Sequence, residues 1–155
     1  MTESGPELSV QYAAIECGAP SRDFIEACVR SALADLDGEL VVRIVDESES
    51  AMLNERYRGK SGPTNVLAFP AGETLAPDSE PKPLGDIVIC AAVVAREAEE
   101  QGKVPEAHWA HIVIHGCLHL GGYDHLADLT AKQMEARERV LLARLGIGDP
   151  YHGER

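Results

Sequence analysis

Four histidines fall within residues 111–125, HIVIHGCLHLGGYDH, although the chain of 155 residues has only 6 histidines. His115 and His119 are four residues apart, so on a helix their imidazoles lie on one face, about 6 Å apart along the axis. Gly122 can adopt the positive φ that ends a helix, which would bring His125 toward the same point. Three neutral imidazoles suit a tetrahedral zinc ion with one position open to water. The spacing therefore predicts one catalytic zinc ion per chain, bound by His115, His119 and His125.

Other arrangements of these residues remain open. The histidines could each be satisfied by a hydrogen bond, or Asp124 could supply a fourth ligand and close the site into a structural one. Cys117 is a poor fourth ligand because it lies about 200° round the helix from His115. The pair His111 and His115 could compete for the metal, but no glycine turn brings a third ligand to it. We expect His111 to lie beside the site or simply to be packed, and His108 to lie on the surface.

The ligand spacing resembles that of the metzincin proteases, HExxHxxGxxH, in which the glutamate after the first histidine is the general base. This chain has Gly116 at that position, so peptide hydrolysis is not expected. A glycine inside a helix costs about 1 kcal/mol relative to alanine. Its presence suggests a need for space beside the metal.

The segments that must position the histidines follow from apolar periodicity and from capping residues. Pro105 suits the first position of a helix over 105–122, and its two terminal glycines suit the end. Pro70 predicts an edge strand or a strand end. Strands are expected at 8–15, 39–46, 64–70 and the start of 85–102; helices are expected at 21–36, 48–58, the rest of 85–102, and 129–146. This order predicts an α+β fold in which residues 1–155 form one domain, with a small mixed sheet packed against helices and the zinc site at the end of a central helix.

Composition restricts the class of protein further. Hydrophobic residues make up 45% and charged residues 26%, as in ordinary globular proteins. The longest uncharged apolar run, residues 87–95, is too short to cross a bilayer. The acidic N-terminus lacks a secretory signal, which favours the cytoplasm and no membrane partner. Four widely spaced cysteines suggest buried free thiols. A net charge of −12 argues against a broad surface for nucleic acids.

Three segments carry a resemblance to a known family. HGCLHLGGYDH, residues 115–125, matches every fixed position of H-G-x-L-H-L-x-G-Y-D-H, the hallmark of the YbeY family of bacterial endoribonucleases. LNERYRGKSGPTNVLAFP, residues 53–70, is similar to the family's YRGKxxPTNVLSFP stretch, with Ala68 where serine is usual. LGDIVIC, residues 84–90, is a third similar segment. The resemblance runs from about residue 40 to residue 145.

The resemblance implies a cytoplasmic, zinc-dependent, single-strand-specific endoribonuclease that matures small-subunit ribosomal RNA and takes part in ribosome quality control. It implies zinc on His115, His119 and His125 and a functional role for Arg58. The expected partners are ribosomal RNA and ribosomal proteins or other assembly factors. The residues expected to contact the substrate are Arg56, Arg58, Lys60, Asn65 and Tyr123.

We hypothesise that a zinc-activated water or the 2′-hydroxyl of the RNA attacks the scissile phosphate, with Arg58 and His115 in catalytic roles. Arg58 would hold a phosphate oxygen through its planar fork. Asp124 would orient a ligand imidazole or a water, or would merely cap the turn. Arg56, Arg58 and Lys60 fall within five positions and form a local basic patch, so weak RNA binding without partners is expected. The alternatives are a non-catalytic ribosome-assembly factor with a structural zinc and a zinc hydrolase with another substrate.

Overall fold

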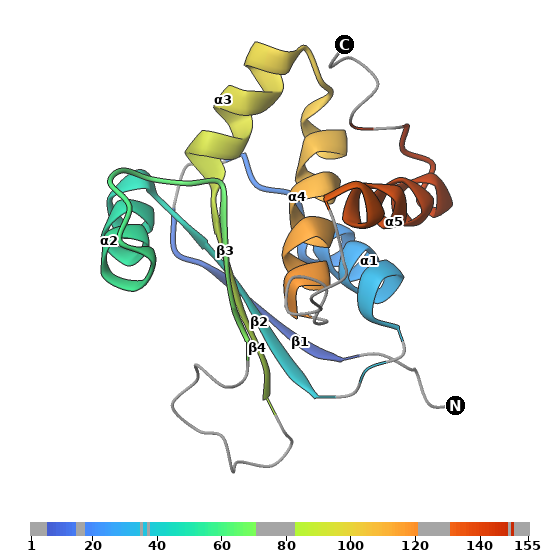
Figure 1. Ribbon diagram of the computed structural model, residues 1–155, viewed down its shortest axis with the longest axis horizontal. Coiled ribbons are helices and arrows are strands. Elements are labelled where there is room, and N and C mark those ends of the chain that lie inside the picture. Colours follow the sequence, from blue (N-terminus) through green and yellow to red (C-terminus); the bar gives the residue numbers. More distant parts are fainter. Residues whose placement is uncertain are drawn as a thin grey trace.

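A computed structural model describes residues 6–14, 18–34, 36, 38–70, 83–120, 131–148 and 150 (Figure 1). The predicted helices and strands are confirmed, with shifts of a few residues at their ends. In chain order they are β1 (Glu7–Tyr12), α1 (Arg22–Leu33), β2 (Glu39–Val45), α2 (Glu47–Arg58), β3 (Val66–Pro70), β4 (Pro83–Cys90), α3 (Ala91–Gln101), α4 (Pro105–Leu120) and α5 (Ala131–Arg144). None of the helices in the described residues is long and apolar enough to span a membrane.

The four strands form one mixed sheet in the order β1-β2-β4-β3. β1 pairs with β2, and β2 with β4, in parallel, whereas β3 pairs with β4 in the antiparallel sense. β3 therefore lies at an edge of the sheet, as Pro70 at its end predicts. The expected α+β fold with a small mixed sheet is confirmed.

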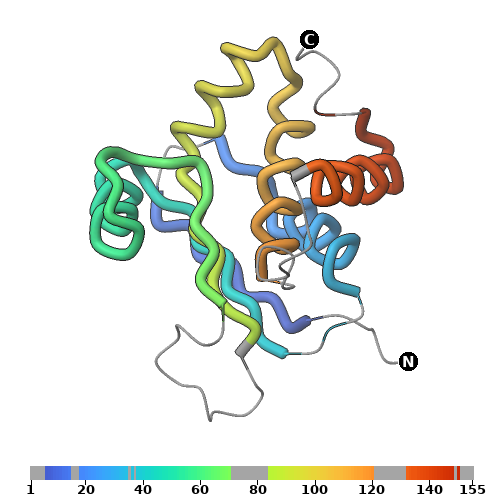
Figure 2. The backbone as a smooth tube through the Cα atoms, in the orientation of Figure 1, coloured from blue at the N-terminus to red at the C-terminus, as the bar shows by residue number. Residues whose placement is uncertain are grey.

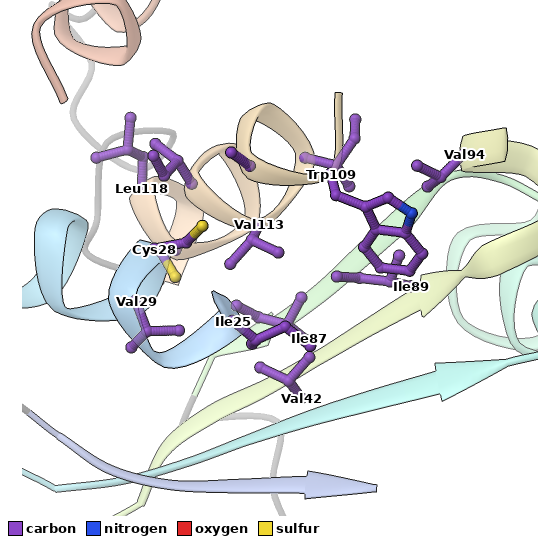
Figure 3. Packing of buried hydrophobic residues seen from close by; sticks show 14 of the residues in the cluster. Ile25, Cys28, Val29, Val42, Ile87, Ile89, Val94, Trp109, Val113 and Leu118 are labelled. Atoms are coloured by element: carbon purple, nitrogen blue, oxygen red, sulfur yellow. The ribbon is translucent and has the colours of Figure 1, made fainter. Parts of the chain in front are cut away.

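Alternate residues of the strands enter two different cores, because successive side chains point to opposite faces of a sheet. Ile87 and Ile89 of β4 join the larger core beneath α1, α4 and α5. Figure 3 shows Val113 and Leu118 of α4 packed beside Cys28 of α1 above this face. Val88 and Cys90 join a smaller core on the other face, against which Leu53 of α2 packs. α2 and α4 thus cover opposite faces of the sheet (Figure 1).

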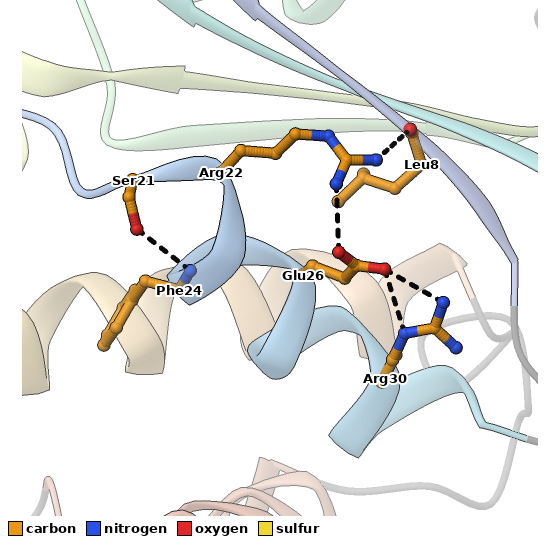
Figure 4. A network of polar contacts seen from close by, with 6 residues as sticks. All are labelled: Leu8, Ser21, Arg22, Phe24, Glu26 and Arg30. Carbon is orange, nitrogen blue, oxygen red and sulfur yellow. Dashed lines mark hydrogen bonds and ion pairs between the residues drawn. The ribbon is translucent and has the colours of Figure 1, made fainter.

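Polar contacts fix α1 against the edge strand β1 (Figure 4). Ser21 caps the helix, because its hydroxyl accepts a hydrogen bond of 3.2 Å from the backbone N–H of Phe24. The Arg22 guanidinium donates to the carbonyl of Leu8 and to Glu26, both at 2.9 Å. These contacts orient the helix that supports one side of α4.

The central helix α4 packs against α1, α3, α5, β3 and β4, and α5 lies across it (Figure 2). It approaches the sheet closely at Gly116: a Cβ there would lie 3.1 Å from Cγ2 of Ile87 and 3.2 Å from Cγ2 of Val66. A larger residue would require the side chains of Ile87 and Val66 to shift by a few tenths of an ångström. Glycine therefore allows this close approach of α4 to the sheet, and Gly116 also lines the pocket beside His115 and His119.

Candidate active site

His115 and His119 lie on successive turns of α4 and point toward each other. Their Nε2 atoms are 3.0 Å apart, and their ring centroids are 4.6 Å apart. Two imidazole ligands of one tetrahedral zinc, with bonds of about 2.05 Å, have nitrogens about 3.3 Å apart. The two Nε2 atoms could therefore bind one metal ion if the two rings moved slightly apart.

A pocket of about 200 Å³ opens beside these two imidazoles. Its walls come from the end of α2, from β3 and from α4, and the lining residues are Arg58, Val66, Ala68, Pro70, His115, Gly116 and His119. The edge position of β3 allows this arrangement, because among the described residues only β4 pairs with it. The tertiary structure thus brings Arg58 to the predicted ligand pair, although 57 residues of sequence separate it from His115.

Arg58 is held in the pocket by backbone atoms and by an aromatic ring. Its Nη2 donates to the carbonyl of Ala68 at 2.7 Å, and its Nη1 donates to the carbonyl of Tyr57 at 3.1 Å. The guanidinium carbon lies 4.8 Å from the centroid of the Phe69 ring. Because the contact at position 68 uses a backbone carbonyl, alanine in place of the family's usual serine leaves it intact.

The residue that sequence reasoning missed is Glu138 of α5. It is fully buried, and its Oε2 lies 2.6 Å from Nδ1 of His115 while its Oε1 lies 3.2 Å from Nε2 of His111. His111, His115 and Glu138 form a candidate metal-binding group by the proximity of their donor atoms. Glu138 is thus a possible third metal ligand for the pair His111 and His115, which spacing along the sequence did not reveal. The sequence does carry one sign of this residue. Glu138 is a carboxylate on the apolar face of a helix, three and four residues before the buried Leu141 and Leu142.

The prediction that His108 lies on the surface is wrong. Its exposed fraction is 3%, and its Nε2 lies 2.8 Å from Oε1 of Glu97 in α3. The amide of Asn65 also donates to Glu97, at 3.1 and 3.2 Å to the two carboxylate oxygens. The polar cluster of His108, Glu97 and Asn65 therefore joins α4 to α3 and to the residue before β3. Asn65 is not among the residues that line the pocket, and its contact with the substrate stays a prediction.

Burial of His108 makes part of the stability dependent on pH. Burial is the largest effect and lowers the pKa of His108, Glu97 opposes this shift, and Lys103 and His111 add to it. The folded pKa is therefore below the unfolded value of about 6.5. The stabilisation that neutral His108 gives the folded protein is fully present above the unfolded pKa. It is lost as the pH falls below that pKa, by at most about 1.4 kcal/mol of unfolding free energy per pH unit.

We predict that His108→Gln reduces the acid sensitivity of folding, because glutamine can still donate to Glu97 but does not titrate. Urea unfolding between about pH 7.5 and about pH 5.5 is the measurement. The wild type is expected to lose more unfolding free energy over this range than the variant. Equal losses would contradict the assignment of the effect to His108.

The remaining predicted site residues do not line the pocket or lie outside the described residues. Arg56 is exposed, with its guanidinium carbon 5.5 Å from the centroid of the Tyr57 ring, and Lys60 is exposed two residues after Arg58. Tyr123, Asp124 and His125 lie outside the described residues, so the third predicted zinc ligand stays a prediction. Cys28, Cys90 and Cys117 are buried free thiols as expected, whereas Cys17 lies outside the described residues.

Known proteins are similar to this chain along most of its length. Residues 10–146 match the family model described as Endoribonuclease YbeY. The chain is 51% identical over 146 residues to the protein named Endoribonuclease YbeY of Methylococcus capsulatus, with 94% of this chain and 95% of that protein covered. The solution structure of TM1509 from Thermotoga maritima is similar with a TM-score of 0.56 and 25% identity, and it covers 95% of this chain and 96% of that one. The chain therefore belongs to the YbeY family of endoribonucleases, metal-dependent enzymes that hydrolyse RNA.

Proposed function

We propose that this chain is a zinc-dependent, single-strand-specific endoribonuclease that matures small-subunit ribosomal RNA and takes part in ribosome quality control in the cytoplasm. One zinc ion per chain is held by His115, His119 and His125. Ribosomal proteins or other assembly factors are its partners. The contacts to the RNA come from Arg56, Arg58, Lys60, Asn65 and Tyr123, with Asp124 orienting a ligand or a water.

One observation carries this proposal: Arg58 and the Nε2 atoms of His115 and His119 share one pocket. A guanidinium can bind phosphate oxygens through two parallel N–H groups. Held beside the ligand pair, it would place a phosphodiester against the metal position. The arrangement has the parts that RNA hydrolysis needs, a phosphate-binding cation and a metal with an open position.

The chain's residues and the metal divide the chemistry. A bound zinc supplies Lewis-acid polarisation of a phosphoryl oxygen and lowers the pKa of a water in its coordination sphere. Arg58 neutralises charge that develops on the phosphate, and its contacts with Ala68 and Phe69 keep it oriented before the substrate arrives. Such fixed orientation lowers the reorganisation needed during the reaction.

The pocket favours a single strand over a duplex. The side chain of His115 lines the pocket and is 34% exposed, so a phosphate that enters the pocket can reach it. A single strand can bend its backbone into such a recess, whereas a base-paired duplex is stiff over this distance. The geometry therefore supports single-strand specificity.

The basic end of α2 supplies a local attraction on an acidic protein. The acidic residues Glu47 and Glu49 lie in the first turn of α2, whereas Arg56 and Arg58 lie in its last turn, where Arg58 lines the pocket. Screening weakens distant exposed charges beyond about 8 to 10 Å, so the net charge of −12 does not prevent this cluster from attracting a phosphate nearby. The small number of basic residues explains why partners on the ribosome would be needed for tight binding.

We predict that the purified protein cleaves an unstructured RNA and leaves the same strand intact once it is annealed to its complement. Dialysis against a chelator should abolish the cleavage, and stoichiometric zinc should restore it. Circular dichroism of the metal-free protein separates loss of the site from loss of the fold. Cleavage that persists without metal, or equal cleavage of the duplex, would contradict the proposal.

A further inference from the structure

We propose that Glu138 is the positioning residue for the metal site: its carboxylate accepts the Nδ1–H of His115 and so directs the Nε2 lone pair of that ring into the pocket. His111 holds the second oxygen of the same carboxylate. This inference rests on the proposed function, because it concerns the zinc ion expected on His115 and His119. It adds His111 of α4 and Glu138 of α5 to the residues that hold this ion in place.

The contact with His115 determines which ring nitrogen faces the pocket. An ionised carboxylate only accepts hydrogen bonds, so the 2.6 Å contact between Oε2 and Nδ1 requires the proton of a neutral ring to be on Nδ1. The lone pair is then on Nε2, the atom that lies 3.0 Å from Nε2 of His119. Glu138 thus selects the tautomer that suits the predicted pair and restrains rotation of the ring.

The position of Glu138 supports a functional reason for a carboxylate there. The residue is fully buried, and Leu141 and Leu142, one turn later on the same face of α5, are fully buried too. A hydrophobic residue of similar volume would pack there without the cost of removing a charge from water. His111 is 12% exposed at its side chain and lies 3.2 Å from Oε1, so both carboxylate oxygens contact imidazoles of α4.

The same geometry argues against Glu138 as a direct ligand together with His115. Two ligand atoms on one tetrahedral zinc are about 3.3 Å apart, whereas Oε2 and Nδ1 are separated by 2.6 Å, which is a hydrogen-bond distance. Ligation through Nδ1 would also leave Nε2 of His115 facing His119 with no metal between them. The carboxylate therefore acts through His115 and not on the ion.

The first test is made on the wild-type protein labelled with 15N at histidine. Long-range 1H–15N spectra should show His115 as the Nδ1–H tautomer in the metal-free state, and added zinc should shift its Nε2 resonance. An Nε2–H tautomer, or zinc bound at Nδ1 of His115, would overturn the inference while leaving zinc binding itself intact. Absence of zinc binding at any histidine of the wild type would instead overturn the proposed function.

The second test measures zinc affinity by competition with a chromophoric chelator in Glu138→Gln. We expect the affinity to fall about 10- to 100-fold, the usual effect of removing a carboxylate that supports a metal-bound imidazole. The visible spectrum of the cobalt-substituted variant should keep the wild-type band pattern, because no ligand has been removed. Glu135→Gln is the matched control, since its side chain is 36% exposed on the same helix. Unchanged affinity in Glu138→Gln, or a changed coordination number in its cobalt spectrum, would contradict the positioning role.

Discussion

Replacing His119 with alanine is expected to abolish stoichiometric zinc binding and to lower the rate of RNA cleavage by about 100-fold or more. The Nε2 of His119 is one of two imidazole nitrogens that lie 3.0 Å apart at the pocket, so the variant lacks one of the two expected ligands. A metal ion is worth several kcal/mol of transition-state stabilisation, and each 1.4 kcal/mol corresponds to about a tenfold change in rate. His115→Ala should have the same effect as His119→Ala, because it removes the other imidazole of the pair.

The comparison is made between wild type, His119→Ala and Glu100→Ala, purified by the same procedure. Glu100 is an exposed residue of α3 and is not among the pocket-lining residues, so its variant should retain both metal and activity. Zinc content, circular dichroism and cleavage of a labelled single strand are measured in parallel. If all three proteins cut equally, the activity comes from a contaminating nuclease and the proposed mechanism is wrong. If His119→Ala keeps its zinc but loses activity, the histidine has another role.

Replacing Arg58 with alanine is expected to lower kcat/KM for RNA cleavage by about 100- to 1,000-fold without changing zinc content, as for the loss of one preorganised donor to a developing anion. The guanidinium lines the pocket with His115 and His119 but belongs to α2, which contributes no predicted metal ligand. The cleavage rate should therefore fall in this variant while its zinc content stays the same. They should fall together in His119→Ala.

Two further arginine variants make this experiment specific. Arg58→Lys keeps the positive charge but lacks the planar fork, so it should recover only a small part of the lost activity. Arg96→Ala removes the same charge from an exposed arginine that pairs with Glu47, and it should cleave RNA like the wild type. A normal rate for Arg58→Ala, or a similar loss for Arg96→Ala, would show that the pocket position of Arg58 does not matter.

The sequence by itself predicted the helices and strands, which the structure confirms, and it predicted the metal-ligand pair His115 and His119. Helical periodicity, the Ser21 cap and Pro105 are local signals, and each predicts the conformation of the residues that carry it. The pairing of His115 with His119 is also local, because one helical turn brings positions four apart to the same face. The family followed from a long motif with fixed spacing, and the matching of residues 10–146 confirms it.

The tertiary structure decided which distant groups surround that pair. Glu138 reaches His115 because α5 packs across α4, and Arg58 reaches the pocket because α2 ends beside the edge strand β3. His108 is buried, against expectation, because α3 covers its side of α4 with Glu97. Nothing in the spacing along the chain reports such contacts, since they depend on how the helices and the sheet pack against one another. Local periodicity therefore predicted His115 and His119 as ligands, whereas packing between elements placed Glu138 and Arg58 beside them.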